Sequence, residues 1–212
     1  MTTGELPAYQ GRSRASRDKI VAALDDLLRE KPFEQLTVAE LAKKAGVAVG
    51  TVYQRFKNKE ALLPVVFQIY LKRLDEWRSG PARIEIEDDD DLRTALRKVF
   101  RQAWKIIRKE AHLLRTVHLQ TRLKPEIAEN TQWKTFEKAS AASIRAIVEY
   151  FEKEVRRENI DRAIDFTTYY FNSIMIEKGL YPEEPPAIFF KQKGTAFADE
   201  CADMLYGYLT LK

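Results

Sequence analysis

The amino-acid sequence predicts an all-α protein. Along most of its 212 residues, apolar side chains recur every three or four positions, which is the spacing of a helix that buries one face. Glycine and proline are scarce, at eight residues each, and the alternation of apolar and polar residues typical of β-strands is absent. These patterns predict about nine helices, four before Pro81 and five after it.

The first helix is expected to follow a flexible basic arm. Residues 1–15 are polar and carry Arg12 and Arg14, so they are predicted to form that arm. From Ser16 the apolar pattern marks one face of a helix, and this helix ends near Lys31 because the proline at position 32 cannot continue it.

The second helix has a start signal and a stop signal. Thr37 and Glu40 have the spacing of a capping box, in which each side chain accepts a hydrogen bond from a backbone amide at the helix start. Gly46 can adopt the left-handed conformation that ends a helix. A third short helix should begin at Ala48 or Val49 and direct Val52 and Phe56 into the core.

The fourth helix is predicted to be longer and bent. Asn58 can cap its start, and its apolar pattern continues to Trp77. Pro64, about six residues into this segment, removes one backbone hydrogen bond and predicts a bend. The Ser-Gly-Pro stretch at 79–81 then ends the helix and opens a linker.

The second half of the chain is predicted to contain five helices. The acidic run 87–91 precedes the periodic segment that starts at Leu92, and carboxylates suit the positive end of a helix dipole, so it is interpreted as a start signal. Gly179 is interpreted as a helix stop. The other four segments cover residues 112–123, 126–157, 161–178 and 188–209.

The excess positive charge lies near the amino terminus. Residues 12–59 contain eleven Lys or Arg and six Asp or Glu, whereas residues 79–212 contain 22 of each. This asymmetry favours a polyanionic partner for the first part of the chain. The single cysteine, Cys201, argues against a disulfide scaffold, and neither a signal sequence nor a membrane-spanning apolar run is present, so a cytoplasmic protein is expected.

Two short helices joined by the turn A-G-V-A form a helix-turn-helix, whose second helix enters the major groove of DNA. Gly50 has no side chain and allows close approach to the duplex, and Thr51 offers a hydroxyl and a methyl group. Tyr53, Gln54 and Arg55 are expected on the same exposed arc.

Residues 16–63 resemble the DNA-binding domain of the TetR family of transcriptional regulators. The resemblance is carried by T-V-A-E-L-A-K-K-A-G-V and by G-T-V-Y-Q-R-F-K-N-K-E-A-L-L. Two positions depart from the family pattern: Ala48 replaces the usual serine, which removes an N-cap, and Arg55 replaces the usual histidine. The residues expected to contact DNA are Arg14, Thr37, Lys44, Val49, Gly50, Thr51, Tyr53, Gln54, Arg55 and Lys59.

The resemblance implies three domain-level features. A helix-turn-helix domain at residues 16–62 would be joined through the fourth helix to an effector-binding and dimerisation domain at 63–212. The last two helices would pair with those of a second copy, which predicts a palindromic operator in double-stranded DNA. The expected dimer residues are Phe171, Met175, Phe197, Cys201, Met204, Leu205 and Tyr208. The expected contacts of an unknown small-molecule effector are Trp104, His118, Trp133, Phe136 and Tyr170.

Neither catalysis nor metal binding is predicted. The only histidines, His112 and His118, are six residues apart and belong to no zinc or di-iron motif, and no nucleophile or phosphate-loop motif appears. No cofactor and no membrane partner are expected. The leading hypothesis is a regulator, a repressor released by its effector. The alternative is an effector-independent DNA-binding or DNA-organising protein.

Overall fold

The computed structural model of the chain describes the backbone of residues 6–80, 84–124, 126, 131–191 and 194–211. Side chains are described from Arg14 onward, apart from most positions between 131 and 140. Within these residues the all-α prediction is confirmed: there are nine α-helices and no strand. None of the described helices is both long and apolar enough to cross a membrane.

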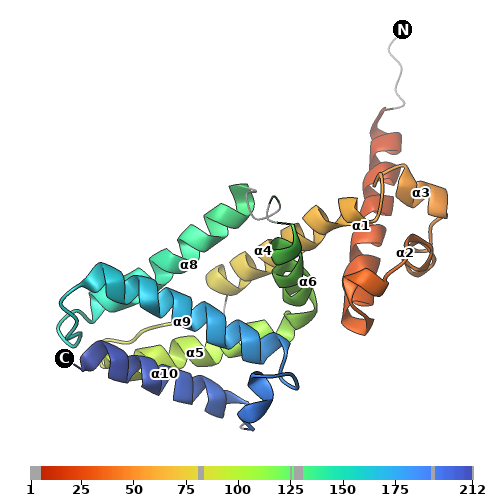
Figure 1. Cartoon of the computed structure of the whole chain (residues 1–212). Helices are drawn as coiled ribbons and strands as arrows, with labels where there is room; N and C mark the ends of the chain where they lie inside the picture. The colour runs from red at the N-terminus through yellow and green to blue at the C-terminus, as the bar shows by residue number, and fades with distance from the viewer. Residues whose placement is uncertain (1–5, 81–83, 125, 127–130, 192–193, 212) are drawn as a thin grey trace. The chain divides into compact units, whose positions relative to one another are not determined.

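The helices are shown in Figure 1. Their bounds are α1 Leu6–Glu30, α2 Val38–Ala45, α3 Val49–Tyr53, α4 Leu63–Ser79, α5 Leu92–Lys109, α6 Ala111–Leu123, α8 Thr131–Tyr150, α9 Ile160–Leu180 and α10 Thr195–Thr210. Three short 3₁₀ turns, η1 Phe33–Gln35, η2 Glu60–Leu62 and η3 Ala187–Phe189, lie between them.

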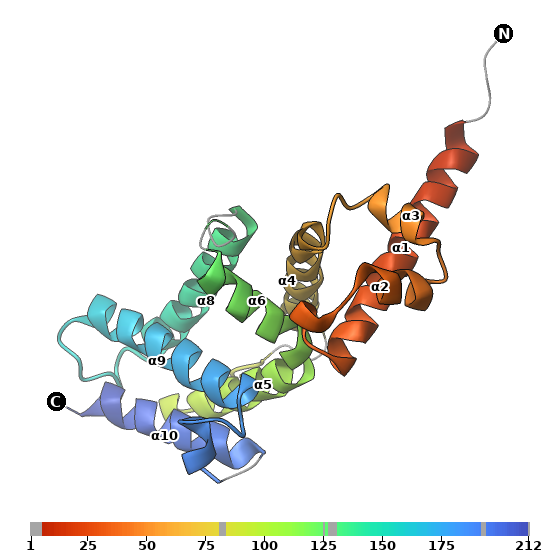
Figure 2. The same ribbon diagram turned by 45° about the vertical axis from the view of Figure 1, so that its right-hand side comes forward.

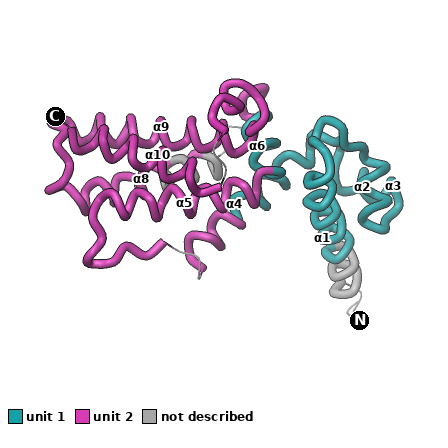
Figure 3. The backbone as a smooth tube through the Cα atoms, turned by 90° about the horizontal axis from the view of Figure 1, so that it is seen from below, with its two compact units in different colours: residues 1–72, 112–120 teal, residues 73–111, 121–212 magenta. Residues whose placement is uncertain are grey.

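The chain divides into two compact units (Figure 3). The first contains residues 1–72 and 112–120, and the second contains residues 73–111 and 121–212. The division differs from the expected boundary at residue 62 because α6 belongs mostly to the first unit. Two hydrogen bonds hold it there, from the His112 ring to Asp25 at 2.9 Å and from Gln120 to Glu34 at 2.7 Å.

Helix α1 begins ten residues earlier than the predicted start at Ser16. Pro7 falls in its first turn, where the missing amide hydrogen has no helical partner to lose, so the proline starts the helix and does not break it. The predicted apolar face is confirmed, since Ile20, Leu24 and Leu28 are buried.

The fourth predicted helix divides into two elements. Asn58 caps the 3₁₀ turn η2 by accepting a hydrogen bond from the amide of Ala61 at 3.0 Å. The α-helix itself begins at Leu63, so Pro64 lies in its first turn and not in its interior. A proline in a first turn removes no intrahelical hydrogen bond, which explains why the helix starts there.

In the second unit, α10 and α9 both pack against α5, and α9 also packs against α8 (Figures 1 and 2). Aromatic side chains fill the interior: Phe100 meets Phe171 edge to face at 4.9 Å, and Trp104 lies 5.2 Å from Phe197 between ring centroids. At the surface, Asp203 accepts hydrogen bonds from both Arg93 and Arg97. The core of the second unit is therefore formed by contacts between residues that are about 70 to 100 positions apart along the chain.

Gly179 does not end α9, which continues to Leu180. A Cβ atom at this position would lie 2.3 Å from the Cγ2 of Ile107, which is closer than two non-bonded carbon atoms approach each other in proteins. The glycine therefore allows α9 to approach α5 closely. The prediction of a helix stop was wrong because the requirement comes from packing between helices.

The predicted start signal of α5 is confirmed. Asp91 is its N-cap, and the carboxylate accepts a hydrogen bond from the amide of Thr94 at 2.7 Å. A hydrogen bond from the Thr94 side chain, followed by the one from its amide, lowers the pKa of the Asp91 carboxyl below its ordinary value. We expect Asp91→Ala to reduce the free energy of unfolding by about 1 kcal/mol at pH 7.

The effect of Asp91→Ala should depend on pH. Because the folded protein lowers this pKa, the cap stabilises the fold above the unfolded pKa of about 3.9 and loses its effect as the pH falls through the folded value. Urea denaturation at pH 7 and at pH 3 measures both values. Asp88→Ala, which removes the same charge from the acidic run, is the control. An equal loss for the two variants would exclude the capping role.

Candidate DNA-binding surface

Helices α2 and α3 of the first unit are joined by a tight turn at Gly46. The glycine adopts φ 64° and ψ 38°, the left-handed conformation that the sequence predicted. Its amide donates to the carbonyls of Ala42 and Lys43, and the amide of Val47 donates to the carbonyl of Ala42 at 3.0 Å. These bonds end α2 in the hydrogen-bond pattern of a Schellman motif and direct the chain into α3.

The start of α2 is held by the predicted capping box. The amide of Glu40 donates to the Thr37 hydroxyl oxygen at 3.2 Å, and the amide of Thr37 donates to the Glu40 carboxylate at 3.0 Å. The Lys31 ammonium also donates to Glu40, and this bond, followed by those from Thr37, lowers the pKa of Glu40 to about 2. The hydroxyl of Thr37, an expected DNA contact, is exposed and takes part in this local network.

Helix α3 presents one face to solvent. Val52 is 1% exposed and anchors the helix, whereas Val49 and Tyr53 are 42% and 53% exposed. Gln54 is also exposed, and Thr51 is half-buried. Large side chains are rarely left exposed next to one another without a reason, so this face suits contact with another molecule.

Gly50 lies on α3, and the fold does not require a glycine there. A Cβ atom added at Gly50 would meet no atom within 4 Å, and the backbone has no positive φ. Glycine weakens a helix by about 1 kcal/mol relative to alanine. Packing within the described part of the chain therefore does not explain the glycine at this position.

Three of the expected cations bind other parts of the first unit. The guanidinium of Arg55 donates to the Ser16 hydroxyl at 2.6 Å, which ties the end of α3 to α1. The Lys59 ammonium donates to the carbonyl of Glu34 at 2.7 Å. Lys44 forms an ion pair with Glu30 at 2.8 Å. All three are among the DNA contacts expected from the sequence, which could not reveal these partners because they lie 14 to 39 positions away along the chain.

Arg14, Arg17, Lys43 and Lys57 are among the cations on the exposed surface of this unit. The side chain of Arg12 lies outside the described residues. Lys57 lies four residues after the end of α3 and was not among the predicted contacts. Its only signal in the sequence is its place in the basic run before Asn58. An exposed cation beside an exposed helix can neutralise a phosphate, because a phosphate can reach it from solvent.

The five expected effector contacts are distributed over both units and beyond the described side chains. Trp104 is buried against Phe197 in the second unit, while His118 is half-buried in the first. The side chains of Trp133 and Phe136 lie outside the described residues. Tyr170 lines a groove, where its hydroxyl lies 3.5 Å from the Cys201 carbonyl and from the Met204 sulfur.

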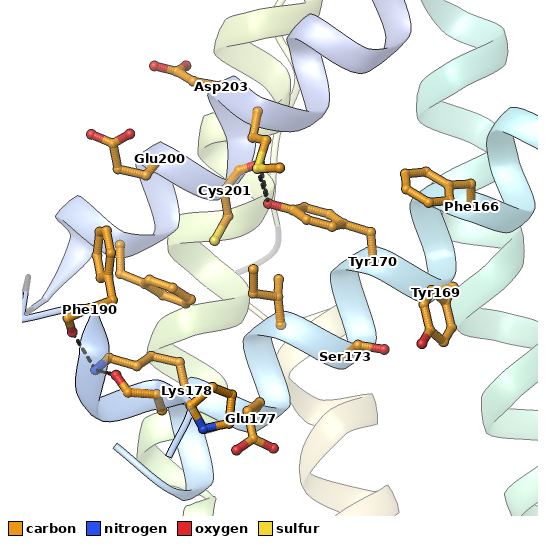
Figure 4. A pocket seen from close by; sticks show the side chains of 15 residues that line it. Phe166, Tyr169, Tyr170, Ser173, Glu177, Lys178, Phe190, Glu200, Cys201 and Asp203 are labelled. Carbon is orange, nitrogen blue, oxygen red and sulfur yellow. Dashed lines mark hydrogen bonds between the residues drawn. The ribbon is translucent and has the colours of Figure 1, made fainter. Parts of the chain in front are cut away.

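The groove runs between α9 and α10 and has a volume of about 780 Å³ (Figure 4). Burial raises the pKa of both the Tyr170 hydroxyl and the Cys201 thiol, the latter to about 11. The rim of the groove includes Phe166, Tyr169 and Met204, which are 44%, 71% and 67% exposed.

Most of the expected dimer residues are not on this rim. Met175, Phe197, Cys201 and Leu205 are buried inside the second unit. Phe171 packs against Phe100, and Tyr208 is half-buried against Phe166. Met204 is the one strongly exposed member of the set. The predicted stripes were the inward faces of α9 and α10, because the apolar period of a helix does not say which apolar residues a chain covers by itself.

Residues 20–66 match the family model described as bacterial regulatory proteins, tetR family. An HTH-type transcriptional regulator of Haemophilus influenzae is 34% identical over 94 residues, 42% of this chain and 44% of that protein. The tetracycline repressor protein class C of Escherichia coli is 32% identical over 85 residues, 40% of this chain and 36% of that protein. The chain thus matches less than half the length of these curated relatives.

The fold of the chain resembles solved structures over nearly its whole length. A transcriptional regulator of Rhodococcus sp. Rha1 has a TM-score of 0.64 with 18% sequence identity, and the match covers 91% of this chain and 94% of that one. At this identity the similarity establishes the fold alone.

Proposed function

Because the chain belongs to the TetR family of bacterial regulatory proteins, we propose that it is a cytoplasmic transcriptional regulator, not an enzyme, which represses genes by binding a palindromic operator. The observation that carries this proposal is the exposed face of α3, with a glycine that the fold does not need and an aromatic residue that is half exposed. The exposed cations of the first unit supply the attraction to phosphate that DNA binding requires.

In the proposed complex, α3 lies in the major groove with Gly50 closest to the DNA. Thr51 and Gln54 contact base edges, and the hydroxyl of Tyr53 donates a hydrogen bond to a phosphate oxygen. Val49 contributes an apolar contact, while Arg14, Lys43 and Lys57 bind the backbone. Thr37 reaches a phosphate from the start of α2. Arg55, Lys44 and Lys59 act at least in part by fixing the position of the unit, since each already binds a partner within it.

A homodimer is proposed through α9 and α10. A two-fold axis places two α3 helices about one DNA turn, roughly 34 Å, apart on one side of the duplex, which is why the operator should be palindromic. The exposed apolar rim of the groove supports this part of the proposal, because patches of this kind in soluble proteins usually mark an interface.

Release by a small-molecule effector is proposed from the path of the chain. Both α4 and α6 run from one compact unit into the other: α4 crosses the boundary after Lys72, and α6 crosses it near each of its ends. A ligand that shifts α5 or α8 would therefore pull on helices that are part of the DNA-binding unit. The tetracycline repressor is a relative whose name states both a ligand and repression.

The proposal is tested with the duplex upstream of the chain's own gene. We expect footprinting to show protection of a palindrome whose half-sites are about one helical turn apart, with an affinity at least about 1,000-fold above that for random DNA at the same salt concentration. Equal affinity for every duplex would contradict sequence-specific regulation and favour the DNA-organising alternative.

Two variants separate the roles of α3 residues in the same assay. Tyr53→Phe removes only the hydroxyl and should weaken binding about equally for operator and random DNA, because phosphate contacts carry no sequence information. Thr51→Val removes a hydroxyl from the helix and should reduce the ratio of specific to random affinity by about tenfold. If Tyr53→Phe instead changed the specificity and Thr51→Val weakened binding to all DNA equally, Tyr53 would be assigned to the bases and Thr51 to the phosphate.

A further inference from the structure

The outward face of α9 carries an ordered stripe of five side chains. Arg162, Phe166, Tyr169, Ser173 and Glu177 are spaced by four, three, four and four residues, so they lie on one side of the helix. Four of them are exposed and Glu177 is half-buried, while Ala163, Ile164, Thr167 and Met175 on the other side are buried. Figure 4 shows the last four stripe residues along α9 at the edge of the groove.

The ends of this stripe carry opposite charges that find no partner in the described part of the chain. No side-chain hydrogen bond or ion pair of Arg162 or Glu177 occurs among those residues. By contrast, the neighbouring Arg145 is paired twice, with Glu149 and Asp161. The middle of the stripe is apolar and exposed, with Tyr169 at 71%.

The stripe is complementary to its own reversed copy. Turning α9 end over end about a point between residues 169 and 170 sets position 162 opposite 177, position 166 opposite 173 and position 169 opposite 170. The first pairing joins a cation to an anion, and the second sets the large ring of Phe166 against the small side chain of Ser173. The third stacks Tyr169 on Tyr170 at the centre. A parallel pairing would instead set Arg162 against Arg162 and Glu177 against Glu177.

We propose that α9 pairs antiparallel with α9 of a second copy of this chain, about a two-fold axis between Tyr169 and Tyr170, so that Arg162 of each copy binds Glu177 of the other. This inference rests on the proposed dimer and names its register and the residues that select the partner. The partner is inferred to be a second copy of this chain because the charges and side-chain sizes of the stripe match those of its own reversed copy at both ends. Such self-complementarity is what an isologous interface requires.

The pairing has a geometric consequence. Positions 162 and 177 are about 22 Å apart along the helix, so each ion pair lies roughly 11 Å from the two-fold axis. If the two α9 helices crossed at about 50°, their backbones would be too far apart at about 11 Å from the axis for Arg162 to reach Glu177 of the other copy. A crossing angle near 20° keeps both ion pairs within reach. The same shallow crossing brings the exposed Met204 of α10 to the border of the interface.

Charge reversal tests the register in the full-length protein. Sedimentation equilibrium should show that Arg162→Glu and Glu177→Arg each raise the dimer dissociation constant about tenfold, since each sets like charges together at two places. The double variant R162E/E177R should return to within about twofold of the wild-type value. A mixture of the two single variants, one of them tagged, should form heterodimers in preference to either homodimer.

The controls are Glu152→Arg and Lys153→Glu, which make the same changes of charge at exposed positions just after α8 and should leave the dissociation constant unchanged. Circular dichroism of every variant confirms that the helices are intact. If the wild-type protein is a dimer but the double variant is not restored and the mixture shows no preference, the register is wrong while the proposed dimer stands. If the wild-type protein is monomeric at micromolar concentration, the proposed dimer itself fails.

Discussion

We expect Gly50→Ala to raise the dissociation constant for the operator by about 100-fold while leaving the protein as stable as before or slightly more so. The added methyl group has free space within the chain, with no atom inside 4 Å, and alanine favours the helical conformation by about 1 kcal/mol. The same methyl group would hold α3 away from the duplex, so every base contact of the helix would lengthen together.

The measurement is a fluorescence anisotropy titration with a labelled operator, accompanied by thermal unfolding of the same preparation. Gly207→Ala is the matched control: it lies in α10, where an added Cβ also meets nothing within 4 Å, and it should leave operator affinity unchanged. If Gly50→Ala binds the operator normally, α3 does not approach the DNA at this residue, and the proposed placement of the helix is wrong.

We expect Arg73→Met to lower the free energy of unfolding by about 3 kcal/mol. The Nη1 of Arg73 lies 2.6 Å from the carboxylate of Glu110, whose side chain is 2% exposed. Glu110 follows α5 directly, at the negative end of that helix, so its charge is unfavourable there without the guanidinium. Removing the arginine leaves a buried carboxylate without its cation.

Replacing both partners tests this reasoning. In R73M/E110L the buried charge is absent, and the stability should recover to within about 1 kcal/mol of the wild type, since a buried ion pair adds little compared with apolar side chains of similar size. Arg145→Met is the control, because its ion pairs are exposed and should contribute little to stability. Chemical denaturation curves give all four values. A double variant no more stable than Arg73→Met would show that the arginine acts through packing and not through charge.

The features that the sequence predicted correctly depend on neighbouring residues. The capping box of Thr37 and Glu40, the left-handed Gly46 and the acidic start signal of α5, which Asp91 caps, each involve a hydrogen bond or a backbone angle within about four residues. The loss of a cap at Ala48 is of the same kind, since α3 has no side-chain cap. Such signals depend little on the rest of the molecule, which is why the helix-turn-helix could be recognised from its residues.

The features that were misjudged depend on partners far along the chain. Gly179 is explained by the close approach of Ile107, and the guanidinium of Arg55 donates to Ser16, 39 positions away. The inward stripe of α10, with Phe197 and Leu205, looked like an interface because it is apolar, yet α5 covers it within the chain.

The sequence by itself determined that this chain is helical, where its helix-turn-helix lies, and which residues α3 carries. It could do so because helix periods, caps and a motif of fixed spacing are local properties of the chain. Only the tertiary structure decided which cations are already occupied, to which unit α6 belongs, and which face of α9 is left uncovered. Those outcomes follow from burial and charge pairing between residues 14 to 110 positions apart, and a linear pattern does not record which of its apolar and charged groups will meet.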